Sequence, residues 1–509
     1  MVIVTITPEI YLEGLKTYAG GLGVLEGDKF SAASELGLNY IVLTLFYRRG
    51  YVDLDFKGEE VTPMPQRQEA HAYRLLKPDE PFTVDLKGEK VIIQPWLYEK
   101  GSSRAVLFEA ECPMWARKLS DQVYIESSSE EQFLKYALLA KASARYIIER
   151  IGLESIKIID LQEAHASLIL FALKNAIDKF RLIIHTPGPW GHPVYPASYI
   201  NKVFGVNVGG DIHLTKYALD LLGSAIVVSM KQRDILSRIF PEHSNKFKPI
   251  TNGIYLRRWM HKTLYKSLGK GDISLDIVVK AREESKKELE KLLQAYKDGI
   301  ELSDKVVVTW VRRLARYKRP YFIARFIEEH GSKTNGLFII GGKPHPKDCD
   351  GLNYAKWFRK LHIKYSNVVF IHDYSVEIAQ KLLQATDIFV FTPFSGWEAC
   401  GTSYMKALVN GVPVISSRDG GAIEIVENGV NGWLFGDDLR EFIDIYNDPR
   451  ARDIDERDYT LFSKLLLQAI ELYSRDPEKY WNIAFKAYVK TPEKVDIRNV
   501  LREYYEELI

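Results

Sequence analysis

The chain has 509 residues, 46% hydrophobic and 27% charged, a balance typical of a folded globular protein and not of a disordered one. Its 69 lysines and arginines nearly cancel its 67 aspartates and glutamates, so the net charge of +2 provides no broad surface for nucleic acid. Three scattered cysteines exclude a disulfide framework and a zinc site, and they fit a cytoplasmic protein. No apolar run reaches the roughly 18 residues of a membrane helix, so we expect no membrane partner.

Short β-branched runs alternate with longer helical patterns along most of the chain. In the first half, the expected strands are residues 2–6, 41–47, 156–161, 181–185 and 226–229, the main helices are 21–36, 130–151 and 231–239, and a mostly β insertion covers about 60–110. A second series has expected strands at 306–310, 337–340, 368–371, 388–391 and 412–416, and the last hundred residues are mainly helical. Strands that alternate with helices predict parallel, doubly wound sheets.

These patterns predict an α/β protein with two Rossmann-like lobes that face a deep cleft. We expect an N-terminal lobe at residues 1–254 and a C-terminal lobe at 255–490, followed by a segment, 491–509, whose helix returns to the first lobe. In open α/β sheets, ligands bind beyond the carboxyl ends of the strands, so loops at those ends are the candidate sites.

A glycine-rich turn, Thr17-Tyr-Ala-Gly-Gly-Leu-Gly23, opens the first expected helix. Unpaired backbone N–H groups at a helix start favour an anion, and glycine lets a phosphate approach closely. The spacing is not that of a dinucleotide fingerprint, because Glu26 holds the third position. A tight turn without a ligand is an equally good interpretation.

A basic loop follows the first strand of the second lobe. It carries five cations in eight residues, namely Arg312, Arg313, Arg316, Lys318 and Arg319. Dense cations at the carboxyl end of a strand suit a phosphate group. The alternative is a solvated basic turn, which this position disfavours.

A stiff loop runs from His185 to Pro193 after another expected strand. Three prolines, two glycines, two histidines and Trp190 give it a defined shape, and it is the kind of surface that stacks on a sugar ring. A purely structural loop explains the same residues equally well.

The last motif places Lys406 eight residues after Glu398, in Glu398-Ala-Cys-Gly-Thr-Ser-Tyr-Met-Lys406. Two-lobed retaining glycosyltransferases often carry Glu-x7-Glu here, where the second glutamate serves a nucleotide ribose. A lysine in its place argues against ribose and for the covalent chemistry of an amine. Taken alone, a surface lysine on a helix is the plainer interpretation.

Together these motifs resemble the glycogen/α-glucan (maltodextrin) phosphorylase family, in which E-A-S-G-T-x-x-M-K carries the cofactor on its lysine. The other matching segments, in chain order, are Tyr18-Ala-Gly-Gly-Leu-Gly-Val-Leu-Glu-Gly-Asp28, Tyr47-Arg-Arg-Gly-Tyr51, Gln162-Glu-Ala-His165, His185-Thr-Pro187, Thr251-Asn-Gly253, Arg313-Leu-Ala-Arg-Tyr-Lys318 and Gly342-Lys-Pro-His-Pro346. The chain is shorter than well-known phosphorylases, and we expect it to lack their regulatory and dimer-contact extensions. Cys400 replaces a serine of the family motif, and Ser375 stands where vertebrate members have an arginine.

The resemblance implies a GT-B fold and a pyridoxal 5'-phosphate cofactor. It implies a glycosyltransferase that moves the terminal glucose of glycogen or maltodextrin to orthophosphate with retention, which gives α-glucose 1-phosphate. The residue roles that it implies are Lys406, Thr402, Arg312, Tyr374 and Gly21 for the cofactor, Arg313, Lys318, Gly20 and Gly21 for orthophosphate, His185 for the glucosyl unit, and Asn252, Glu398 and Gly401 for sugar hydroxyls. His185, Arg313, Lys318 and Lys406 form the expected catalytic set, and no metal is expected.

Two other functions compete with this one. A nucleotide-sugar-dependent α-glucan (glycogen) synthase would share the two-lobed fold and the basic loop, and Lys406 in place of the second glutamate argues against it. A non-catalytic glucan-binding protein would need neither that lysine nor a phosphate loop. The sequence does not fix the oligomeric state, and a homo-oligomer is compatible with it.

Overall fold

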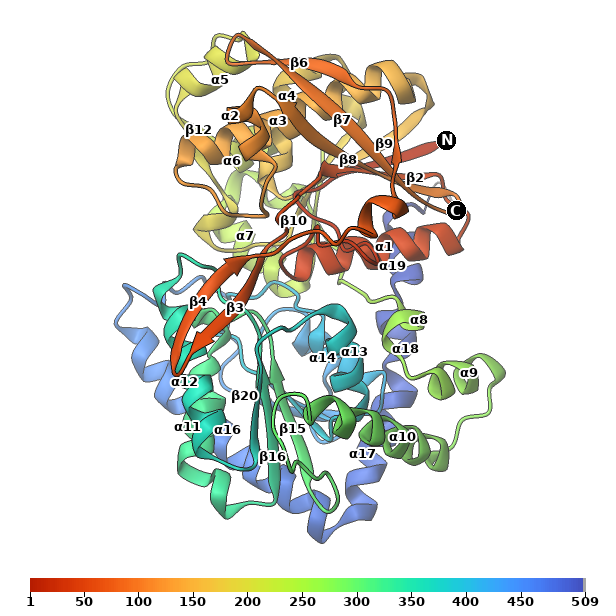
Figure 1. Ribbon diagram of the computed structural model, residues 1–509, viewed down its shortest axis with the longest axis vertical. Helices are drawn as coiled ribbons and strands as arrows, with labels where there is room; N and C mark the ends of the chain where they lie inside the picture. The colour runs from red at the N-terminus through yellow and green to blue at the C-terminus, as the bar shows by residue number, and fades with distance from the viewer. Residues whose placement is uncertain (507–509) are drawn as a thin grey trace. The chain divides into compact units, whose positions relative to one another are not determined.

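The computed structural model describes residues 1–506 and divides into two compact units. Unit 1 contains Met1–Tyr51, Pro65–Thr251 and the chain from Leu501 onward, and unit 2 contains Val52–Met64 and Asn252–Val500. Each unit is a mainly parallel sheet with helices around it, which confirms the predicted α/β class (Figure 1). None of the helices within residues 1–506 is both long enough and apolar enough to cross a membrane. Residues 507–509 of the expected terminal segment lie outside the described part.

The sheet of unit 1 has the order β14-β13-β10-β9-β1-β2-β8-β7-β5, with β6 beside β7. Its parallel strands are β1 (Val2–Ile6), β2 (Tyr40–Leu45), β8 (Ser103–Cys112), β9 (Ile156–Gln162), β10 (Phe180–Ile184), β13 (Ala225–Val227) and β14 (Phe247–Pro249). The antiparallel extension consists of β5 (Lys77–Pro78), β6 (Phe82–Leu86) and β7 (Glu89–Lys100). The strand order reverses between β1 and β9, which is where ligands bind in doubly wound sheets.

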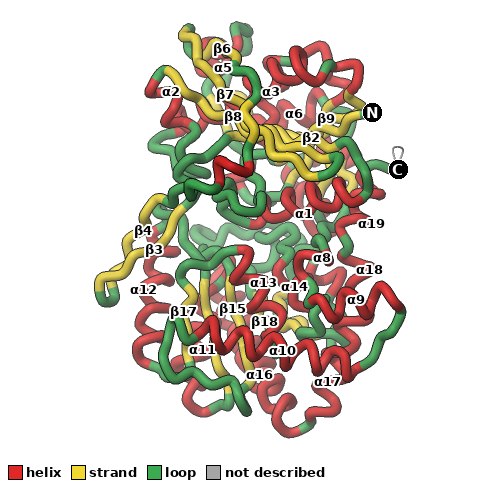
Figure 2. The backbone as a smooth tube through the Cα atoms, turned by 45° about the vertical axis from the view of Figure 1, so that its right-hand side comes forward, coloured by secondary structure: helices red, strands yellow, loops and turns green. Residues whose placement is uncertain are grey.

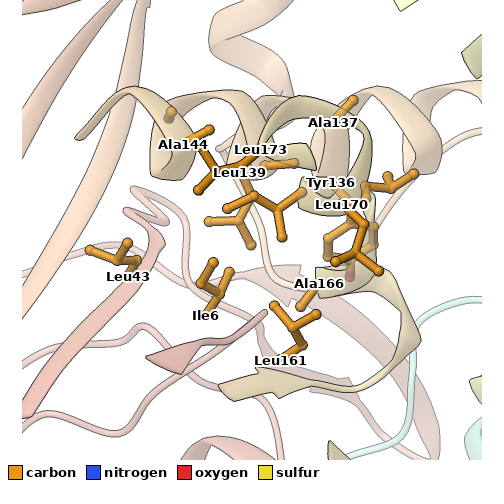
Figure 3. Close-up of a cluster of buried hydrophobic side chains, with 14 of the residues drawn as sticks. Ile6, Leu43, Tyr136, Ala137, Leu139, Ala144, Leu161, Ala166, Leu170 and Leu173 are labelled. Atoms are coloured by element: carbon orange, nitrogen blue, oxygen red, sulfur yellow. The ribbon is translucent and has the colours of Figure 1, made fainter. Parts of the chain in front are cut away.

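Helices cover the unit 1 sheet and bury its apolar side chains. They are α1 (Gly21–Glu35), α2 (Met114–Leu119), α3 (Ser129–Tyr146), α4 (Ile169–Ala172), α5 (Ala197–Phe204), α6 (Leu214–Leu221) and α7 (Met230–Ile239). In the core, Ile6, Leu43 and Leu161 of the strands face Leu139 of α3 and Leu170 of α4 (Figure 3). Full burial on both faces explains why these strands are continuous apolar runs.

Unit 2 has a six-stranded, fully parallel sheet in the order β17-β16-β15-β18-β19-β20. The strands are β15 (Val306–Val311), β16 (Gly336–Gly341), β17 (Val368–Ile371), β18 (Ile388–Phe391), β19 (Val414–Ser417) and β20 (Gly432–Phe435). The helices are α8 (Leu256–Trp259), α9 (Lys262–Lys270), α10 (Leu275–Leu293), α11 (Pro320–His330), α12 (Cys349–Lys364), α13 (Val376–Ala385), α14 (Ser403–Leu408), α15 (Ala422–Ile425), α16 (Arg450–Arg475), α17 (Pro477–Lys490), α18 (Pro492–Val495) and α19 (Ile497–Tyr504), which ends in unit 1 (Figure 2). Here the order reverses between β15 and β18, so the loops after these strands form the candidate site.

A hairpin from the first half of the chain, β3 (Val52–Lys57) and β4 (Glu60–Pro65), packs on unit 2. Lys343 Nζ lies 2.8 Å from an oxygen of Asp53, and the ring of Phe56 lies 6.0 Å from that of Phe370. Sequence order alone assigns this segment to the N-terminal lobe, whereas these contacts make it part of unit 2.

Candidate active site

The carboxyl edge of the unit 2 sheet carries a largely buried carboxylate, Glu398, whose side chain is 11% exposed, between two cations. Arg312, which directly follows β15, donates from Nη2 to Glu398 Oε1, and Lys318 Nζ lies 3.1 Å from the same oxygen. Burial alone raises the pKa of the Glu398 carboxyl, but the charges of Arg312 and Lys318 outweigh it and hold that pKa below its usual value. Glu398 is therefore ionised at neutral pH, and the three side chains together carry one net positive charge.

The backbone around Glu398 is fixed by a second buried carboxylate. Asp419 accepts hydrogen bonds from the backbone N–H groups of Gly396, at 2.7 Å, and Glu398, at 2.8 Å. Because hydrogen bonds to a charged acceptor are strong, Asp419 sets the position of the Glu398 main chain.

Arg312 retains hydrogen-bonding capacity beyond its pairing with Glu398. Its guanidinium stacks over the ring of Phe391, with Cζ 3.9 Å from the ring centroid, and Nη1 is buried with no hydrogen-bond partner among the described residues. Burial raises the pKa of the Tyr374 phenol, and the charge of Arg312 partly offsets this effect. A buried donor without a partner costs stability, so Arg312 Nη1 is a ready position for an anionic ligand.

Gly401 and Asn252 lie beside Glu398. A side chain at Gly401 would place its Cβ 2.4 Å from Glu398 Oε1 and 2.9 Å from the Phe391 ring, so only glycine leaves this space open. Asn252 donates from Nδ2 to the backbone oxygen of Cys400 at 3.1 Å. Burial raises the pKa of the Cys400 thiol to about 12, so Cys400 is a neutral thiol and not a nucleophile.

Lys406 lies on α14, which begins directly after Thr402. It is buried, and its Nζ lies 3.9 Å from the centroid of the Trp259 ring. Of the predicted cofactor residues, Arg312 thus lies in the loop after β15, Thr402 ends the loop after β18, and Lys406 lies on α14, which that loop leads into. Arg313, by contrast, is exposed, and its Nη2 lies 3.4 Å from the Tyr317 hydroxyl.

The glycine turn of unit 1 is already occupied by a carboxyl group of the protein itself. The carboxylate of Glu9 accepts hydrogen bonds from the backbone N–H groups of Ala19, at 2.5 Å, and Gly20, at 3.1 Å, and from the Tyr124 hydroxyl. Gly21 is exposed at the start of α1. A phosphate at Gly20 would have to displace this carboxylate, and the predicted phosphate role of Gly20 and Gly21 stays a prediction. The sequence gives one signal for Glu9, a lone acidic residue just after a buried strand.

His185 lies at the carboxyl end of β10 in unit 1. Its Nε2 is 2.8 Å from Gln162 Oε1, while Gln162 Nε2 donates to Thr5 Oγ1. Because the Gln162 side chain presents its oxygen to His185, the imidazole carries its proton on Nε2, and Nδ1 is left as an acceptor. Burial, with a smaller contribution from the charge of Lys29, lowers the pKa of His185 to about 3, so the ring is neutral and can accept a hydrogen bond from a sugar hydroxyl.

Glu163 is a further candidate functional residue, to which the sequence motifs assign no role. It has a φ of 67° and a ψ of 160°, a region that non-glycine residues rarely adopt, and it accepts hydrogen bonds from Thr186 Oγ1 and from the His185 N–H. Burial raises its pKa to about 7. A strained, buried carboxyl that titrates near neutral pH is typical of functional sites. Its sequence signal is an acidic residue directly after β9.

No group of histidine, cysteine and acidic residues within residues 1–506 is arranged to hold a metal ion.

Comparisons with known proteins show similarity to carbohydrate phosphorylases. Residues 270–494, which include the basic loop and Lys406, match the family model for carbohydrate phosphorylases. A glycogen phosphorylase from Aquifex aeolicus is 26% identical over 86% of this chain and 76% of its own length. A maltodextrin phosphorylase from Thermococcus litoralis is 22% identical over 98% of this chain and 70% of its own. An uncharacterized protein from Methanocaldococcus jannaschii is 24% identical over 97% and 96% of the two chains.

The raised pKa of Glu163 predicts a specific dependence of stability on pH. The folded protein binds this proton up to about pH 7, whereas an unfolded glutamate releases it near pH 4.5. Stability from this group is therefore fully present below pH 4.5 and is lost as the pH rises through 7. The glutamine in Glu163→Gln does not titrate, so its contribution to stability does not change with pH. Between pH 5 and pH 8 the free energy of unfolding of the wild type should therefore fall by about 2 kcal/mol relative to that of Glu163→Gln.

Thermal unfolding of both proteins at pH 5 and pH 8 measures this difference. We expect the midpoint of Glu163→Gln to rise relative to wild type at the higher pH. An equal offset between the two proteins at both pH values would show that Glu163 does not titrate in this range.

Proposed function

Because the chain is a member of the glycogen/maltodextrin phosphorylase family, we propose that it is an α-1,4-glucan phosphorylase. In the proposed reaction, orthophosphate takes the terminal glucose of glycogen or maltodextrin with retention, and α-glucose 1-phosphate leaves. The proposal places the enzyme in the cytoplasm, which is consistent with its three free cysteines.

The observation that carries the proposal is the position of Lys406. It follows Glu398 by eight residues and is buried beside Trp259 in the unit that also contains the partnerless Nη1 of Arg312. A synthase that uses nucleotide sugars would need a ribose acceptor at this position, and a lysine ammonium has no acceptor lone pair. A non-catalytic binding protein would not need a buried lysine at this position.

The residues present fit pyridoxal 5'-phosphate. Lys406 offers an amine that is largely removed from water, which favours attachment of an aldehyde. The proposal assigns the cofactor phosphate to Arg312 and Thr402 and includes Tyr374 in the cofactor site. Gly401 has no side chain and so leaves space beside Glu398, where a Cβ would lie 2.4 Å from Oε1. When bound, the cofactor supplies a phosphate that acts on orthophosphate as a proton or electrostatic partner.

The chain's own residues then bind and orient the substrates. Arg313 and Lys318 are assigned to orthophosphate, where their charges offset the repulsion between two phosphates. Glu398 is ionised and accepts hydrogen bonds from sugar hydroxyls, and Asn252 supports the loop of Gly401 through its bond to Cys400. In unit 1, the neutral ring of His185 offers Nδ1 to the glucosyl unit.

The proposed function is tested by the phosphate dependence of glucose release. Purified protein loaded with pyridoxal 5'-phosphate is incubated with maltoheptaose and orthophosphate, and the products are identified by phosphorus and proton NMR. We expect α-glucose 1-phosphate and maltohexaose, and no reaction with UDP- or ADP-glucose. Glucose transfer from a nucleotide sugar, without glucose 1-phosphate from glucan and phosphate, would establish the synthase instead.

Arg313→Ala should weaken the use of orthophosphate far more than the retention of cofactor. A guanidinium grips two phosphate oxygens at once, and once bound orthophosphate covers the exposed Arg313 side chain, the loss of that contact costs on the order of 3 kcal/mol, roughly a hundredfold in rate. The cofactor absorbance should remain, because Arg312 and Lys406 are unchanged.

Arg316→Ala is the matched control for Arg313→Ala. It removes a cation from the same loop, but the Arg316 guanidinium donates to the backbone oxygen of Ile445 and stacks on Tyr446. We expect its phosphate KM and kcat to stay within about threefold of wild type. Equal and small effects of the two variants would mean that the loop is only a solvated basic turn.

A further inference from the structure

The loop after β10 keeps a tryptophan exposed at the ligand edge of the unit 1 sheet. Trp190 is 47% exposed and is the only exposed tryptophan within residues 1–506. It follows His185 by five residues, and β10 runs parallel to β9, so the loop leaves the sheet at the carboxyl edge that also carries Glu163. Its neighbours Pro189 and Val194 are exposed as well, so the outer side of this loop is apolar.

Both ends of the loop are fixed to the body of unit 1. Thr186 Oγ1 donates to Glu163, and His192 Nδ1 lies 2.8 Å from Thr215 Oγ1. Between them, the N–H groups of Gly191 and His192 donate to the backbone oxygens of Gly188 and Pro189, each at 3.0 Å. Pro187, Gly188, Gly191 and His192 are buried. The exposed indole thus extends from an ordered support and not from a loose loop.

The indole itself is held against Gly188. A Cβ built on Gly188 would lie 2.1 Å from two carbons of the Trp190 ring, and the three nearest atoms all belong to that ring. The backbone at Gly188 has a φ of −84° and a ψ of 164°, which any residue adopts. Glycine is needed at this position because it leaves room for the indole, and not because of its backbone conformation.

The chemistry of the loop fits a neutral ligand. Residues 185–195 include no aspartate, glutamate, lysine or arginine. Burial lowers the pKa of His185 to about 3 and that of His192 to about 4, so both rings are neutral at physiological pH. An uncharged, rigid, half-exposed indole next to hydrogen-bonding groups suits the C–H face of a sugar ring better than a phosphate.

We propose that Trp190, positioned by Gly188, is a stacking platform for a glucose unit of the glucan chain other than the unit that is transferred. The inference rests on the proposed function for the identity of the glucan, and it adds a subsite that recognises the chain. Trp190 belongs to binding and takes no part in bond cleavage. Its contribution therefore depends on glucan length and is absent for glucose 1-phosphate.

Isothermal titration of purified, cofactor-loaded protein with maltoheptaose and with glucose 1-phosphate tests this subsite. Trp190→Ala should weaken maltoheptaose binding about fivefold to tenfold, as expected for the loss of one aromatic stacking contact. Gly188→Ala should have a similar effect, because its methyl group displaces an indole that is still present. Glucose 1-phosphate should bind both variants within about twofold of wild type.

Trp115→Ala is the matched control. Trp115 is a partly buried tryptophan of the same unit, on α2, whose Nε1 donates to Glu89. This variant should bind both ligands as wild type does, and circular dichroism should show all three variants folded.

The outcomes separate this inference from the proposed function, since binding is measured without turnover. Maltoheptaose affinity within twofold of wild type in Trp190→Ala would overturn the platform, as would an equal loss for glucose 1-phosphate. An unchanged Gly188→Ala would overturn the positioning role of Gly188. A protein that binds maltoheptaose through Trp190 but forms no glucose 1-phosphate would refute phosphorolysis and support the platform.

Discussion

The pairing of the Glu398 carboxylate with the buried side chains of Arg312 and Lys318 is the interaction on which the candidate site depends. All three side chains are largely removed from water, so loss of the Glu398 carboxylate would leave two buried cations without their counter-charge, at a cost of about 3–5 kcal/mol. The set keeps one net positive charge, and Arg312 Nη1 has no protein partner among the described residues. In the proposed function, Arg312 Nη1 is the donor available to the cofactor phosphate, and the net positive charge of the set favours that anion.

The pKa shifts of the buried glutamates in unit 1 are opposite in direction to that of Glu398. Glu9 and Glu163 are also buried at the carboxyl edge of a parallel sheet, but their hydrogen-bond partners are neutral N–H and O–H groups. With no cation to offset burial, the pKa of each carboxyl rises, whereas that of Glu398 falls. Unit 1 therefore presents groups suited to neutral hydroxyls, and unit 2 presents groups suited to phosphate.

Much of the fold could be predicted because buried parallel strands are continuous apolar runs. The expected strand at 306–310 is β15 with one residue added, and 388–391 is β18 without change. The motifs likewise led to Arg312, Glu398 and Lys406. Tertiary contacts could not be predicted in this way. No local sequence pattern shows that the hairpin at 52–65 packs on α12, where Glu60 forms an ion pair with Lys356. No local pattern shows either that Glu163 has a positive φ or that the Glu9 carboxyl occupies the glycine turn.

The proposed function requires the buried amine of Lys406 to carry the cofactor. Borohydride reduction of protein reconstituted with pyridoxal 5'-phosphate, followed by proteolysis and mass spectrometry of the labelled peptide, tests this directly. We expect one phosphopyridoxyl group, on Lys406, and its loss in Lys406→Ala, with no loss in Lys364→Ala, which removes an exposed lysine of α12. A label on another lysine, or a reducible label retained by Lys406→Ala, would show that Lys406 is not the attachment site.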